Sequence, residues 1–156
     1  MSQAQHSPAA SLAQELESAR ELLDCLQQEQ AHLIQADIAA LEACAERKNA
    51  LVGRMNMLAA ARLQSLAGAG HPATEAGMLA WLEQQQDTVR ADWRALLGLA
   101  ASGKELNRTN GLLIHQHMNR TQTGLQALRG GGQQPGVYGR DGQQNVRTSG
   151  RTFVAG

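Results

Sequence analysis

The stretch of sequence that decides the fold covers residues 106–142 and reads LNRTNGLLIHQHMNRTQTGLQALRGGGQQPGVYGRDG. Up to Leu128 its apolar residues recur every three or four positions, which predicts an α-helix. Three consecutive glycines, Gly130 to Gly132, then end this pattern. We interpret the rest of the chain as a helical platform that presents this helix and the tail behind it.

The apolar seam of this last helix is interrupted by polar side chains. It consists of Leu106, Asn110, Leu113, His117, Thr121, Leu125 and Leu128, so three of its seven positions are polar. Buried polar residues can fix the register of a coiled coil at a cost in stability. A half-polar seam can equally await the helix of a partner. The pattern leaves both interpretations open.

The composition favours an all-α protein. Trp81, Trp93, Tyr138 and Phe153 are the only aromatic residues in a chain dominated by Leu, Ala, Gln, Arg and Glu. A net charge of zero without a basic block counts against a nucleic-acid partner. No apolar run approaches the ~18 residues of a membrane span, and the N-terminus does not read as a signal peptide. We therefore expect a cytoplasmic protein without membrane insertion.

Residues 9–67 form the first helical segment. Its seam starts at Leu12, Leu16, Ala19, Leu23, Leu26 and Leu33. The seam then shifts to Ile34, Ile38, Leu41, Ala45, Lys48, Val52 and Met55. Because no Gly or Pro intervenes, we predict one helix that bends near Asp37, although Asp37 could also cap a break. Residues 68–72 end the segment, and Thr74 caps the next one.

The second helical segment runs from Thr74 towards Arg129. Gly98, Ser102 and Gly103 weaken it but supply no adequate turn, which predicts a kink. The fold is then a long antiparallel helical hairpin; the alternative is an elongated three-helix bundle with a turn near Ser102. Either way, residues 1–129 form the helical domain and residues 130–156 a glycine-rich flexible tail.

Trp81 lies at the edge of the apolar stripe of this segment, about 100° from Leu82 on a helical wheel. It therefore either covers the margin of the core or contacts a partner.

No set of residues predicts catalysis, a cofactor or a metal. On one continuous helix Cys25 and Cys44 would lie roughly 28 Å apart, so we expect two reduced, buried thiols. His115 and His117 project from opposite faces of a helix and cannot chelate one ion. The acidic residues sit at spacings typical of a solvated helix surface.

The order of three features resembles the FlgN family of flagellar export chaperones. The first helix sets Glu29, Asp37 and Lys48 among leucines. The last helix carries Asn107-x-x-Asn110-Gly111-x-Leu113-Ile114, and a glycine-bearing linker leads to Tyr138-Gly139-x-x-Gly142. The resemblance covers most of the chain, whereas the tail is longer and richer in glycine than in enteric members.

The resemblance implies a cytosolic chaperone and not an enzyme. Its clients would be the hook–filament junction proteins FlgK and FlgL, whose C-terminal helical segments bind the last helix before delivery to the export gate protein FlhA. The implied client-binding residues are Leu106, Asn110, Leu113, Ile114, His117, Thr121, Leu125 and Leu128. Tyr138, with Gly139 and Gly142, would dock on the gate. Free chaperones of this kind can form homodimers through the client surface.

A second hypothesis is a homo-oligomeric coiled-coil scaffold without a secreted client. In that case the polar seam would be buried against a copy of itself, as a stable homodimer. The chaperone hypothesis instead predicts a heterodimer with a helical client.

Overall fold

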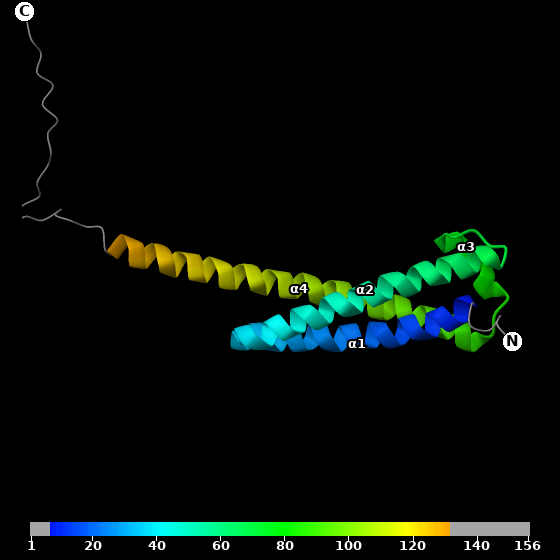
Figure 1. The fold of residues 1–156 in the computed structure, drawn as a ribbon, viewed down its shortest axis with the longest axis horizontal. Coiled ribbons are helices and arrows are strands. Elements are labelled where there is room, and N and C mark those ends of the chain that lie inside the picture. Colours follow the sequence, from blue (N-terminus) through cyan, green and yellow to red (C-terminus); the bar gives the residue numbers. More distant parts are fainter. Residues whose placement is uncertain (1–6, 132–156) are drawn as a thin grey trace, which may run out of the picture. The chain divides into compact units, whose positions relative to one another are not determined.

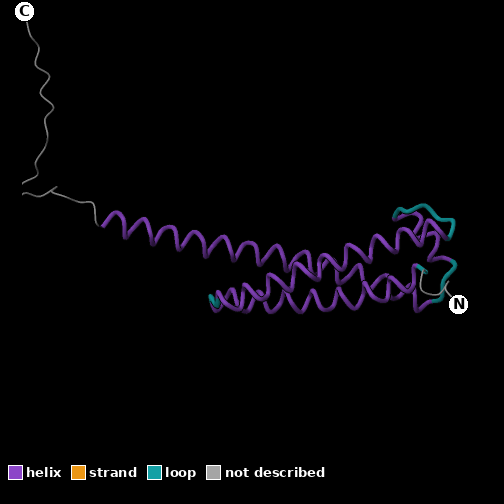
Figure 2. Tube along the Cα trace, viewed as in Figure 1, coloured by secondary structure: helices purple, strands orange, loops and turns teal. Residues whose placement is uncertain are grey.

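The computed structural model describes residues 7–131, which form four α-helices (Figure 1). These are α1 (Pro8–Gln35), α2 (Ile38–Gly68), α3 (Glu75–Glu83) and α4 (Asp87–Gly131). They contain 28, 31, 9 and 45 residues, so more than two thirds of the chain is helical, and the described part has no strand (Figure 2). The all-α prediction is confirmed. Gly130 and Gly131 of the predicted tail belong to α4. The rest of the predicted tail, including Tyr138, Gly139 and Gly142, lies outside the described residues.

The chain divides into two compact units, residues 1–116 and residues 117–156. The first holds α1, α2, α3 and α4 up to Gln116. The described part of the second is the remaining helical stretch of α4, from His117 to Gly131.

The predicted bent helix over residues 9–67 is wrong: the chain reverses at Ala36 and Asp37. Ala36 adopts the left-handed conformation (φ 55°) that ends many helices. Asp37 Oδ1 then accepts a hydrogen bond from the backbone N–H of Ala40 (3.1 Å) and caps α2. The shift of seam at Asp37 therefore marked a helix break. Of the residues predicted to follow in the seam, Ile34 and Ile38 are exposed.

Because α1 and α2 are antiparallel (Figure 1), the two cysteines are neighbours rather than roughly 28 Å apart. Cys25 Sγ donates to the backbone oxygen of Cys44 at 3.6 Å, and both side chains are buried, free thiols. Burial, followed by the nearby Cys44, raises the pKa of the Cys25 thiol. A raised pKa disfavours the nucleophilic thiolate form of this side chain. The expectation that both thiols are buried is confirmed, but the geometric argument that keeps them far apart was wrong.

The turn between α2 and α3 follows the sequence prediction. Gly70 adopts φ 85°, and the N–H of His71 donates to the carbonyl of Leu66. Thr74 caps α3 by accepting a hydrogen bond from the N–H of Gly77 at 3.1 Å.

Gly77 is required where α3 lies against this turn. A Cβ atom at this position would lie only 1.9 Å from the carbonyl oxygen of Pro72.

We expect Gly77→Ala to lower the free energy of unfolding by about 1–3 kcal/mol, the usual range for overpacking. Urea denaturation measures this change. Gly53→Ala is the matched control, because nothing lies within 4 Å of its Cβ position; it should stabilise α2 by up to about 1 kcal/mol. Equal effects of the two substitutions would contradict the steric argument.

The second predicted helix also breaks, between Gln84 and Gln86. The N–H groups of Gln84 and Gln85 bond back to Trp81 and Leu82, and α4 begins at Asp87. No Gly or Pro marks this break either. In contrast, α4 is continuous through Ser102 and Gly103, so the alternative turn there is wrong. The first unit thus contains three long helices and one short helix. The sequence pattern predicted the turn before α3 but not the breaks at Ala36 and Gln85.

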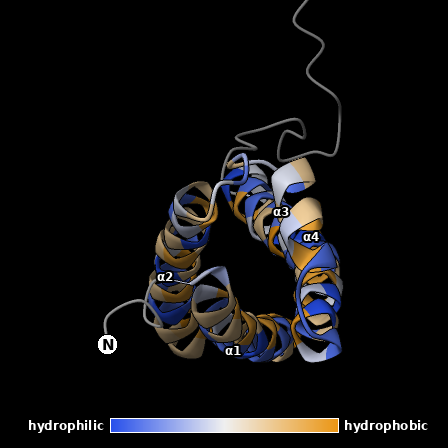
Figure 3. Ribbon diagram, turned by 90° about the vertical axis from the view of Figure 1, so that its right-hand side faces the viewer, coloured by the Kyte–Doolittle hydropathy of each residue, from blue (hydrophilic) through white to orange (hydrophobic). Residues whose placement is uncertain are grey.

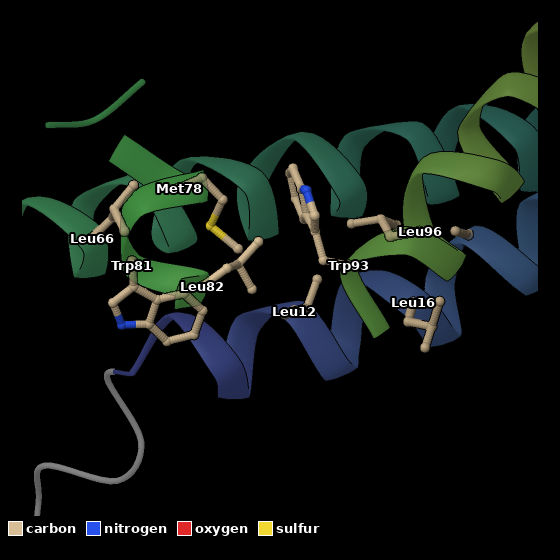
Figure 4. Packing of buried hydrophobic residues seen from close by; sticks show 9 residues of the cluster. Leu12, Leu16, Leu66, Met78, Trp81, Leu82, Trp93 and Leu96 are labelled. Carbon is tan, nitrogen blue, oxygen red and sulfur yellow. The ribbon is translucent and has the colours of Figure 1, made fainter. Parts of the chain in front are cut away.

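All four helices contribute to the apolar core of the first unit (Figure 4). Its buried members are Leu12, Leu16, Ala19, Leu66, Met78, Trp81, Leu82, Trp93 and Leu96. Trp81 is therefore a core residue and not an exposed partner contact. Figure 3 views the helices from the end that carries α3 and shows polar and apolar residues on every helix.

One ion pair is buried at the edge of this core. Arg62 Nε donates to Glu15 Oε1 at 2.7 Å, and Arg62 Nη2 donates to Glu15 Oε2 at 3.3 Å. The guanidinium carbon also lies 4.8 Å from the centroid of the Trp93 ring. The pair therefore joins α1, α2 and α4.

Candidate functional site

Helix α4 carries all the residues predicted to bind a client, but they do not form one continuous surface. Within the first unit, Asn110 is fully buried, Leu106 and Leu113 are partly buried, and Ile114 is 40% exposed. Within the second unit, His117 is partly exposed, and Thr121, Leu125 and Leu128 are exposed. Asn110 is thus an internal residue and cannot touch a partner in this conformation.

A polar cluster fixes α4 against α1 and α2. We call Glu29, Lys48, Asn107 and Asn110 the polar clamp. Asn110 Nδ2 donates to the carbonyl of Leu26 (2.9 Å) and to Glu29 Oε2 (2.8 Å). Lys48 Nζ donates to Glu29 Oε1 (2.8 Å) and to Asn107 Oδ1 (3.4 Å).

The polar clamp decides between the two interpretations of the seam at Asn110. Its amide finds both partners on one turn of α1, so this residue fixes the register of α4. Asn110 Oδ1 has no hydrogen-bond partner within the described residues. Asn110 is also the last buried residue of α4.

An apolar groove of about 440 Å³ lies next to the polar clamp, between α1, α2 and α4. Its walls include Leu22, Leu23, Leu26, Val52, Met55, Leu99 and Gly103. Lys48 and Lys104, the only lysines of the chain, also line it. The sequence prediction missed this groove, since it placed the residues of α1 and α2 on one helix.

In the second unit, α4 exposes a row of residues that we call the C-terminal seam: Met118, Thr121, Leu125 and Leu128. The steps of three, four and three residues are those of a coiled-coil seam. Met118, Leu125 and Leu128 are 62%, 51% and 78% exposed. Such large exposed fractions along one stripe are typical of a binding face. Met118 was not among the predicted residues, although its spacing to Leu125 could have identified it.

Near the start of the predicted client-binding site, α4 carries an ion pair between Arg108 and Glu105. Arg108 donates to both carboxylate oxygens of Glu105, at 3.1 and 2.6 Å. This hydrogen bond lowers the pKa of Glu105. The Glu105 and Arg108 side chains are 64% and 61% exposed, so the pair contributes little to stability.

A comparison with protein-family models identifies the family of this chain. The family model described as FlgN protein matches residues 1–145. This chain belongs to the FlgN family. No curated protein and no solved structure matches it.

The FlgN family consists of chaperones for flagellar export substrates. As a member of this family, the chain is a flagellar export chaperone. None of the helices within residues 7–131 is both long and apolar enough to cross a membrane. The same residues contain no group of three or more His, Cys, Asp or Glu side chains that could hold a metal ion.

Proposed function

We propose that this chain is a cytoplasmic chaperone that binds the C-terminal helical segments of the junction proteins FlgK and FlgL. It prevents their premature assembly and delivers them to the export gate protein FlhA. The observation that carries the proposal is the C-terminal seam: a helix stripe with coiled-coil spacing whose leucines face solvent. Family membership supports flagellar export substrates as the class of partner.

The second candidate, a homo-oligomeric scaffold, uses the same seam against its own copy. The polar positions disfavour it. Asn110 is already bonded inside the chain, so it is not available to pair with a second copy. Of the three polar positions in the predicted seam, His117 and Thr121 remain for such a contact.

Alanine substitutions in the seam test the client function. Leu125→Ala combined with Leu128→Ala should weaken binding of a FlgK or FlgL C-terminal segment by about tenfold or more, or about 1.4 kcal/mol. The melting temperature should stay within about 2 °C, because exposed side chains contribute little to stability. Isothermal titration calorimetry and circular dichroism measure the two effects. Leu79→Ala is the control, since Leu79 on α3 is 52% exposed, like Leu125.

The proposal fails if neither segment binds the unmodified chain. If the seam substitutions instead lower the melting temperature by many degrees, the seam is buried in a self-assembly and the scaffold hypothesis gains.

Docking on the export gate rests on the tail residues Tyr138, Gly139 and Gly142. Tyr138 is the one aromatic residue between Gly130 and Gly142, and a single aromatic anchor can supply much of a peptide's affinity. Tyr138→Ala should weaken binding to the cytoplasmic part of FlhA by about 1–3 kcal/mol. Client affinity should not change, and Phe153→Ala serves as the comparison. An unchanged affinity for FlhA would end the docking role of Tyr138.

A further inference from the structure

The net charge of zero conceals a strong asymmetry along the chain. After Glu105 the sequence contains one acidic residue, Asp141. Six of its 14 basic residues lie in the same part: Arg108, Arg120, Arg129, Arg140, Arg147 and Arg151. Within α4 the 26 residues from Leu106 to Gly131 carry three arginines and no carboxylate. The first 105 residues are correspondingly acidic.

The C-terminal seam lies within this carboxylate-free part of α4. Arg129 follows Leu128 directly and borders the seam, whereas Arg120 precedes Thr121 and lies about 100° around the helix from it. Both are exposed, and neither forms a salt bridge within the described residues. A partner that covers the C-terminal seam therefore lies close to arginine side chains that form no salt bridge within the described residues.

A second copy of the chain is a poor occupant of this seam. Two copies packed along it would bring arginines together without any carboxylate between them, and like charges at a helix interface are destabilising. The charge therefore disfavours self-association here.

A membrane surface is also a poor occupant. Helices that lie in an interface have a polar face rich in Lys and Arg and an apolar face with Trp, Phe or Leu. Between Trp93 and Tyr138 this chain has no aromatic residue, and Thr121 interrupts the apolar stripe. The three-and-four spacing is that of packing against a helix.

We propose that the C-terminal seam binds an amphipathic α-helix whose apolar stripe is bordered by Asp and Glu. Such a helix covers the leucines and supplies the carboxylates that this part of α4 lacks. The inference deepens the proposed function, on which it rests, because it specifies the chemistry of the client segment. Opposite charges beside the stripe speed association and select against basic helices.

Two synthetic helical peptides test this inference on the full chain. They share the same apolar residues at seam positions, and their bordering positions carry either Glu or Lys. We expect the Glu peptide to bind at least about tenfold more tightly at about 50 mM salt, and this ratio to shrink at about 500 mM. Equal affinities of the two peptides would overturn the inference.

Charge reversal on the chain provides the reciprocal test. Arg120→Glu with Arg129→Glu should abolish or invert the preference for the Glu peptide. Arg20→Glu with Arg54→Glu is the matched control: it makes the same change of charge on α1 and α2, at exposed residues. A preference that persists after reversal on α4, or that is lost equally in the control, places the recognition elsewhere.

Two further measurements separate the rival occupants and the parent proposal. Binding to anionic phosphatidylglycerol vesicles that is lost on reversal of the α4 arginines would assign the seam to a membrane and overturn the inference. Self-association that depends on Leu125 would also overturn the inference and would assign the seam to a second copy of the chain.

If FlgK and FlgL segments bind without salt dependence, the inference fails while the proposed function stands. If the Glu peptide is preferred but no junction protein binds, the proposed function fails alone.

Discussion

Glu15→Ala is expected to lower the free energy of unfolding by about 3–5 kcal/mol, the largest effect of any single polar substitution considered. The Glu15 and Arg62 side chains are only 4% and 11% exposed. Removal of the carboxylate leaves the Arg62 guanidinium buried beside Trp93 without a counter-charge. Chemical denaturation monitored by far-ultraviolet circular dichroism measures the loss.

A double substitution separates two contributions to the free energy of unfolding: the cost of a buried, unpaired charge and the stability that the ion pair itself contributes. Glu15→Leu with Arg62→Met removes both charges and keeps most of the volume. It should recover most of the stability lost in Glu15→Ala, since apolar replacement of a buried ion pair is often neutral or stabilising. The surface pair Asp24 and Arg47 is the control: its side chains are 55% and 43% exposed. Asp24→Ala should cost no more than about 1 kcal/mol. A loss of similar size at both sites would contradict the role of burial.

Asn110→Asp is expected to have the second largest effect, a loss of at least about 3 kcal/mol. The amide nitrogen of Asn110 donates to two acceptors, Glu29 Oε2 and the carbonyl of Leu26. A carboxylate in its place faces both acceptors with no donor and adds a buried negative charge next to Glu29. Hydrogen exchange should show the loss first in residues 106–113, where α4 is held by the polar clamp.

Asn107→Asp is the matched control for this prediction. Asn107 is exposed and already accepts a hydrogen bond from Lys48 at 3.4 Å, so a carboxylate there gains a partner. Stability should change by less than about 0.5 kcal/mol. If both substitutions weaken the fold equally, the buried donor of Asn110 is not what holds α4.

Local patterns in the sequence were enough for much of this fold. Low aromatic content and three-and-four spacing indicated helices, and the leucines from Leu12 to Leu33 are largely buried as predicted. Gly70 and Thr74 marked the turn before α3 because positive φ and helix capping depend on the residue itself. The exposed leucines of the C-terminal seam were also recognisable from their spacing.

The two other turns depended on tertiary structure. Ala36 and Gln85 carry no local signal for a reversal as strong as Gly or Pro. At Ala36 the chain turns because α1 and α2 gain more from packing against each other than a continuous helix would gain from propensity. At Gln85 the turn allows residues of α3 and α4 to enter the same core. That reversal at Ala36 alone brings Cys25 next to Cys44 and Glu29 next to Lys48.

The same reason explains the candidate site. Spacing along α4 identified Asn110 and Leu125 as members of one seam, and the sequence by itself could not distinguish them. Only the position of α1 against the first part of α4 makes Asn110 an internal donor, whereas Leu125 in the second unit is exposed. The sequence determined which residues lie on one face of each helix; the tertiary structure decided which of those faces are covered, because burial depends on contacts between residues far apart in the chain.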